Sequence, residues 1–158
     1  MPVDVTIDPK IAGELKALAR KLKAGDQVNL RRELTKGLRA GVKPVAAALK
    51  ARALGLPSHT GGTLRAAIAK AVTIQVRTGG KSPGIRLRIP NAKMGDRAAL
   101  PRLMNRGTWR HPVFGSDTWV EQTSETNWWD DTAKAGRSSV VTEIRHVLDD
   151  IERKSRIR

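Results

Sequence analysis

Catalysis needs side chains that converge, and this sequence offers one group, a poor candidate, that can be imagined as an acid–base cluster. His111, Asp117 and Glu121 follow one another closely, and a histidine near carboxylates can transfer protons. A histidine before a proline more often makes local hydrogen bonds, and acids that follow a glycine often cap turns. A hydrolase that uses His111 and Asp117 is therefore a weak hypothesis, the least favoured of the three considered below. We expect that the protein is not an enzyme and has no catalytic residue.

Other patterns that hold metals, phosphates or nucleophiles are missing from the sequence. It has no cysteine, and His59, His111 and His146 show no ligand spacing, so we expect no metal and no cofactor. It also lacks the glycine-rich phosphate loop, HExxH and the nucleophile elbow. No apolar run is long enough to span a bilayer, and the start does not resemble a signal peptide. We therefore expect no contact with a membrane.

The chain is strongly basic, and its charge is unevenly distributed. Its 158 residues carry a net charge of +15 and suit a single domain, 1–158. Residues 51–115 hold twelve bases and one acid, whereas residues 116–158 hold seven bases and nine acids. A solvated face, an acidic protein partner and a nucleic acid are all consistent with this middle segment. The basic residues expected around it are Arg77, Lys81, Arg86, Arg88, Lys93, Arg97 and Arg102.

The few aromatic residues are concentrated between residues 105 and 122. Aromatic residues make up 3% of the chain, yet this stretch contains two of the four Trp and the single Phe. Such rings bury much area, so the stretch predicts either a loop fixed by its own side chains or a docking surface. The residues expected to form this anchor loop are Asn105, Arg106, Gly107, Trp109, Arg110, His111, Pro112, Phe114, Gly115 and Trp119.

Hydrophobic periodicity predicts the elements that position this stretch. Helical spacing follows Asp8-Pro9 and again covers about 29–53, where Pro44 should kink or divide the helix. A short helix over 64–70 precedes a hairpin at about 71–90, and a short strand lies near 118–122. Asn127 can cap a final helix that Gly136 could bend. We expect an α+β fold: a small antiparallel sheet of the hairpin and the short strand, packed by the long kinked helix and the C-terminal helix. Residues 91–104 are expected as a flexible loop and 153–158 as a frayed basic tail.

The aromatic stretch also carries a family resemblance. Its Asn-x-Gly-x-Trp-Arg-His-Pro-Val-Phe-Gly string, followed by Trp-Val-x-Gln, closely resembles tail-completion and head–tail connector proteins of long-tailed double-stranded DNA phages. These are also called minor tail components. The predicted helix pair, the Gly-Thr-Leu-Arg run, the hairpin and the Trp-containing entrance to the last helix follow the family's order. The resemblance covers 7–151.

This resemblance implies a structural virion protein that forms a homo-oligomeric ring in the phage neck. Such a ring joins the portal side of the head to the tail tube around the DNA channel; a hexamer is expected, and a dodecamer is conceivable. The implied partners are other copies, head-completion or connector proteins, tail terminator or tail tube proteins, and passing DNA. The implied location is the virion neck, with host cytoplasm during assembly. The alternative hypothesis is a basic DNA-binding protein without sequence specificity.

Overall fold

The computed structural model describes residues 4–6, 9–24, 28–57, 62–78, 84–112 and 117–156. In chain order these residues form β1 (Asp4–Thr6), α1 (Pro9–Ala24), α2 (Val28–Gly55), α3 (Thr63–Ala71), β2 (Thr73–Arg77), β3 (Gly84–Arg88), α4 (Asn91–Met94), the 3₁₀ helix η1 (Gly95–Arg97), α5 (Leu100–Arg106), β4 (Thr108–Pro112), β5 (Trp119–Thr123), α6 (Trp128–Ala135) and α7 (Arg137–Arg156). The combination of helices with small antiparallel sheets confirms the predicted α+β class.

The described residues form two separate antiparallel sheets. The first has the strand order β1-β3-β2, and the second pairs β4 with β5. The predicted hairpin is confirmed as β2 and β3. The predicted strand near 118–122 exists as β5, but its assignment to the hairpin's sheet is wrong, because β5 pairs with β4. The third strand of the first sheet is β1, whose three residues carry too short a pattern to be found from periodicity.

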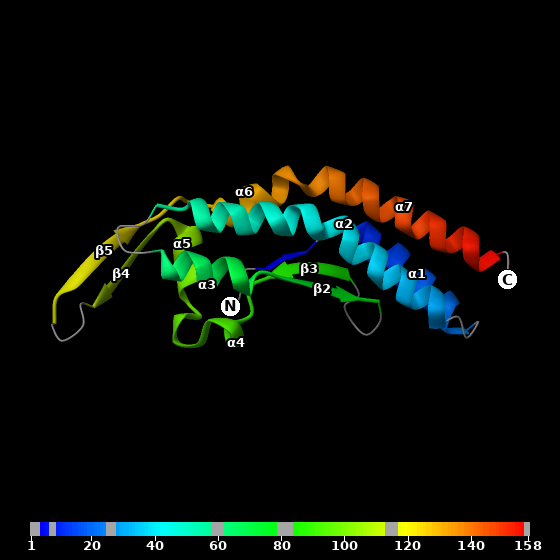
Figure 1. Cartoon of the computed structure of the whole chain (residues 1–158), viewed down its shortest axis with the longest axis horizontal. Helices are drawn as coiled ribbons and strands as arrows, with labels where there is room; N and C mark the ends of the chain where they lie inside the picture. Colours follow the sequence, from blue (N-terminus) through cyan, green and yellow to red (C-terminus); the bar gives the residue numbers. More distant parts are fainter. Residues whose placement is uncertain are drawn as a thin grey trace.

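Helix α2 is the longest element, and its apolar stripe lies in the core. Leu34, Leu38, Val42 and Leu49 are completely buried, in one cluster that also contains Ile85 of β3 and other residues of the sheet. Pro44 lies inside α2 without dividing it. The ribbon changes direction along α2, and the loss of the proline N–H explains a bend without a break (Figure 1).

The C-terminal helical region lies along α2 (Figure 1). Two glycines of α2 allow the close approach: a Cβ on Gly37 would come within 2.7 Å of Val147, and one on Gly41 within 2.9 Å of Glu143. The predicted last helix is divided at Gly136 into α6 and α7, and a Cβ there would collide with Val45 of α2. Close backbone packing therefore requires small residues on both sides of this contact.

Two segments expected to lack regular structure are helical. Residues 91–104 form α4, η1 and most of α5, with Met94 and Met104 buried, so the predicted loop is wrong. Their apolar residues are too sparse to give a periodic signal, and burial under neighbouring elements supplies the missing stabilisation.

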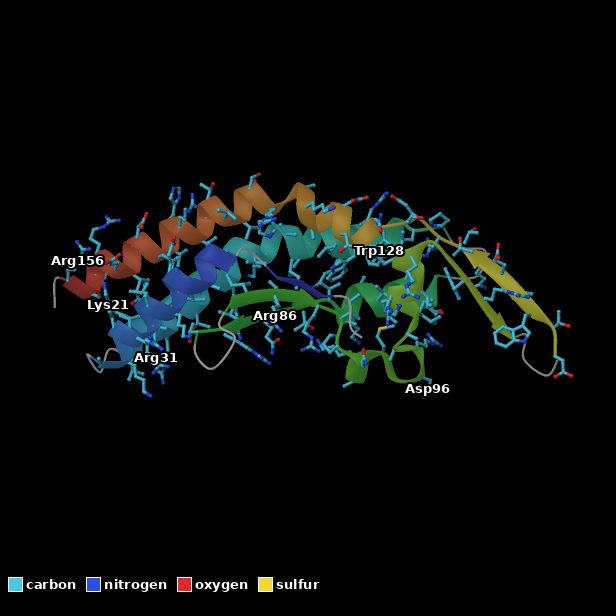
Figure 2. All side chains as sticks on the ribbon, turned by 180° about the vertical axis from the view of Figure 1, so that it is seen from behind. Lys21, Arg31, Arg86, Asp96, Trp128 and Arg156 are labelled. Carbon is cyan, nitrogen blue, oxygen red and sulfur yellow. The ribbon has the colours of Figure 1, made fainter. Side chains whose placement is uncertain are left out.

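The basic tail is ordered as helix at least to Arg156, so the predicted fraying from residue 153 is wrong. Lys154 bridges Glu33 of α2 at 3.2 Å and Asp150 at 2.9 Å. Glu152 accepts from Lys21 of α1 at 3.4 Å and from Arg156 at 2.9 Å, and Figure 2 shows Lys21 and Arg156 together at this end of the molecule. Hydrogen bonding to Arg156 and Lys21 lowers the pKa of Glu152, and bonding to Asp150 and Glu33 raises the pKa of Lys154.

Candidate functional site

The aromatic stretch forms a β-hairpin that projects from one end of the molecule (Figure 1). We call its two strands, β4 and β5, the arm. Trp109 pairs with Gln122 near its base, and Pro112 pairs with Trp119 farther out. The predicted anchor loop is therefore wrong over β4, which is a strand, whereas β5 agrees with the strand predicted near 118–122. Phe114 and Gly115, both expected in the anchor, lie outside the described residues.

Asn105, the last but one residue of α5, fixes the base of the arm to helix α6. Its side-chain oxygen accepts from the backbone N–H of Trp129 at 2.9 Å, and its amide donates to Asp130 at 2.7 Å. Its backbone carbonyl accepts from the N–H of Asn127 at 2.7 Å. The N-cap of α6 is thus supplied across the chain by Asn105. The prediction that Asn127 caps this helix is wrong, because Asn127 has φ 57° and makes no side-chain cap bond.

Gly107 forms the joint between α5 and the arm. Its φ of +95° lies in a region that other residues rarely adopt. A Cβ at this position would collide with the side chain of Thr126, and the Gly107 carbonyl accepts from the N–H of Ser124 at 2.6 Å. The backbone therefore holds both strands of the arm at their base. The Asn-x-Gly part of the string has a structural explanation that needs no ligand.

The four tryptophans have different roles. Trp128 and Trp129 are 1% and 0% exposed and meet edge to face, with ring centroids 5.7 Å apart. Trp109 is half-buried and packs against the core cluster, whereas Trp119 on β5 is 55% exposed. The sequence left two alternatives for these aromatic residues, packing within the chain or docking to a partner. Trp109 packs within the chain, whereas the exposed Trp119 is available for docking. The sequence alone does not predict that Trp128 and Trp129 anchor the core, because a Trp pair at the start of a helix does not by itself indicate which side of the helix is buried.

The remaining predicted residues on the arm do not form an enclosed site. Arg106, at its base, and Arg110 on β4 are exposed. In the register of the two strands Arg110 lies opposite Glu121. Asp117 and Glu121 are exposed, and the side chains of His111 and Pro112 lie outside those described. Within the described parts of the chain, no three His, Asp or Glu side chains are grouped to hold a metal ion.

The predicted basic surface is divided between two places. Arg86 lies opposite Gln75, and Arg88 lies opposite Thr73, so both arginines belong to the face of the sheet that points away from buried Ile85 and Leu87. Figure 2 shows Arg86 on the side of the sheet remote from α7. Arg77, Lys93, Arg97 and Arg102 are exposed on β2, α4, η1 and α5, and Lys81 lies outside the described residues.

A more continuous basic surface lies on α2 and was missing from the predicted set. A hollow of about 610 Å³ is lined by Arg31, Arg32, Lys36, Arg39, Lys43, Val28, Thr35, Ala40 and Thr78. A second hollow of about 450 Å³ shares Lys43 and is lined also by Ala46, Ala47, Lys50, Val72, Thr73, Ile74 and Lys93. We call the two together the cationic groove. The sequence holds a signal for it, because the α2 cations recur at helical spacing.

Comparison of the chain with protein-family models, with curated proteins and with solved structures finds no match. Among the described helices, none is both long and apolar enough to cross a membrane.

Proposed function

We propose that this protein is a structural subunit of a phage neck, where copies assemble into a ring between the head and the tail tube. The observation that carries the proposal is the arm: a hairpin bonded at its base to the rest of the chain, which projects from one end of the molecule and carries a tryptophan that is 55% exposed (Figure 1). Exposed tryptophans on a projecting element are typical anchors of protein interfaces. The resemblance of the 105–122 string to neck proteins supplies the biological setting.

A ring requires each subunit to present two different complementary surfaces. The arm provides one of them at one end of an elongated body, and the α2–α6–α7 side offers a candidate for the other. That side contains a groove of about 520 Å³ lined largely by small residues, including Ala40, Ala48, Ala135 and Ser139. The partners of the ring would be other copies and the adjoining head-completion and tail proteins.

The purified full-length protein tests the arm directly. We expect mass photometry to detect a ring, and we expect Trp119→Ala to shift the population to monomers at the same concentration. Leu54→Ala is the matched control, because Leu54 is a 52% exposed apolar residue on α2; it should leave the ring intact. Equal ring formation by Trp119→Ala and the unchanged protein would contradict a role for the arm.

The neck assignment has its own test in infected cells. Removal of the gene should yield separate filled heads and separate tails in electron micrographs, and the unchanged gene supplied in trans should restore joined particles. Normal virions without the protein would overturn the neck assignment, even if the purified protein forms rings.

A further inference from the structure

We infer that the cationic groove binds the phosphate backbone of duplex nucleic acid without reading its sequence. This inference depends on the groove of a single chain and does not require ring assembly. Seven side chains of its lining are cationic, namely Arg31, Arg32, Lys36, Arg39, Lys43, Lys50 and Lys93, and among the described residues none that lines it is acidic.

The cations of α2 form a row along one side of the helix, which bends along its length (Figure 1). At about 100° per residue, Arg32, Lys36, Arg39, Lys43 and Lys50 fall within about 60° of one another around the helix; we call these five residues the cationic stripe. At about 1.5 Å per residue the stripe is about 27 Å long. A duplex rises about 3.4 Å along its axis per base pair, so the stripe is as long as about eight base pairs of duplex and can contact the phosphates that face it.

The stripe is available for an external anion. All five of its side chains are exposed, and in the described parts of the chain no ion pair involves any of them. Helix α7 contacts α2 at Gly37 and Gly41, which lie on the opposite side of the helix from the stripe. Like charges held in one row repel one another, so a bound polyanion would relieve an unfavourable interaction.

The second wall of the groove adds hydrogen-bond donors. Strand β2 is at the edge of its sheet, so part of its backbone N–H groups lacks a partner strand among the described residues. Thr78 also lines one of the hollows, whereas the Thr73 hydroxyl already donates to the Ala71 carbonyl at 2.9 Å and accepts from Lys93 at 2.9 Å. Hydroxyl and backbone N–H groups commonly contact phosphate oxygens beside Lys and Arg.

The composition of the groove selects a duplex over the other polyanions. The described residues that line it include no aromatic residue, whereas proteins that bind single strands stack the bases on aromatic side chains. A second copy of this chain is a poor occupant: α7 has the most acids of any described element, but its four acids are outnumbered by five bases. The occupant must therefore bring its own dense row of negative charges.

Fluorescence anisotropy with the full-length protein and a 30-base-pair DNA duplex tests the inference. We expect binding at about 50 mM salt, with an affinity that falls steeply as salt rises. The variant Lys36→Gln/Arg39→Gln/Lys43→Gln should bind roughly 100-fold or more weakly at about 0.1 M salt, and the slope of log K against log salt should become shallower by about 3, because each lost phosphate contact removes about 0.9 from it.

The control variant is Arg20→Gln/Lys23→Gln/Arg145→Gln, which removes three exposed cations outside the groove and lowers the net charge equally. Circular dichroism should show that both variants remain folded. If the control weakens binding as much as the groove variant, the attraction is a property of net charge and the inference fails. No retention of the duplex at about 50 mM salt would also overturn it.

Competitors identify the class of polyanion. A duplex of shuffled sequence should compete equally, and a single strand of the same length should compete less well. More effective competition by the single strand would overturn the duplex assignment. Competition by polyglutamate at an equal concentration of charge would instead identify an acidic protein as the occupant and overturn the inference.

Discussion

Two pairs of tryptophans lie at different depths in this molecule. Trp128 and Trp129 are in the core under α2, where they contact each other edge to face. On the arm, Trp109 is half-buried at the base and Trp119 is 55% exposed. The adjacent pair, Trp128 and Trp129, is buried in the core and stabilises the fold. The stretch that stands out in the sequence instead carries the residue that is available for docking.

The connection between these regions is as informative as the contrast. Asn105 accepts from the backbone of Trp129 and therefore joins the base of the arm to the helix that contains the buried pair. A mobile arm would lose entropy on docking, whereas an arm that is already held in place loses less. In the proposed assembly, the buried pair and its cap would contribute indirectly, by orienting the exposed tryptophan.

The largest effect should come from the buried pair. Trp129→Ala removes a side chain with no solvent exposure, and truncation of a buried Trp lowers the free energy of unfolding by about 3–5 kcal/mol. Urea titration followed by circular dichroism measures this loss. Trp129→Phe, which retains an aromatic ring, should lose less. An unchanged midpoint in Trp129→Ala would show that the pair is not the anchor of the fold.

A smaller loss is expected at the connection. Asn105→Ala leaves the N–H of Trp129 without its cap and should reduce the free energy of unfolding by about 1–2 kcal/mol. The exchange Asn105→Asp/Asp130→Asn keeps an acceptor for Trp129 and an amide–carboxylate bond in the reverse direction. It should recover most of the stability, as measured by the same titration. Equal losses in the single and the exchanged variant would argue against the cap.

An exposed ion pair provides a reference for surface contributions. The lowered pKa of Glu152 means that its contribution to stability is present above its ordinary pKa of 4.5 and disappears as the pH falls through the lower folded value. Glu152→Gln should therefore melt at a slightly lower temperature than the unchanged protein at pH 7; the difference should begin to shrink near the ordinary pKa of 4.5 and vanish once the pH is below the lowered folded pKa. A difference that persists in acid would assign the effect to packing.

The smallest effect on stability should come from the exposed tryptophan. Trp119→Ala should change the free energy of unfolding by less than about 0.5 kcal/mol, because exposed side chains away from special features contribute little. Measured beside Trp129→Ala in one titration series, it tests the comparison between the two regions. A loss of several kcal/mol would place Trp119 in the core of the folded chain and remove the arm as a docking element.

The elements whose residue pattern repeats at helical or strand spacing could be predicted from the sequence. The apolar stripe of α2, from Leu30 to Leu49, repeats at helical spacing because one side of the helix is buried. The alternation in 72–76 and 85–89 predicts β2 and β3 for the same reason, with a period of two. The cationic stripe is local as well: five basic residues on one helix define it before any tertiary contact is known.

The candidate site depended on contacts between residues far apart in the chain. Asn105 and Trp129 are separated by 24 residues, and no local pattern reports that one caps the helix of the other. Similarly, β5 pairs with β4 and not with β2 or β3. The alternation of side chains within a strand does not indicate which other strand it pairs with. Residues 91–104 become helical where neighbouring elements bury Met94 and Met104.

The amino-acid sequence by itself therefore determined the α+β class, the buried faces of the long helices and the distribution of charge, because each depends on the identity of residues a few positions apart. Only the tertiary structure decided which tryptophans are buried, how the arm is attached and where the cationic stripe meets the edge of the sheet. Those features depend on close packing and on hydrogen bonds between distant segments, and such bonds form only when the whole chain has folded.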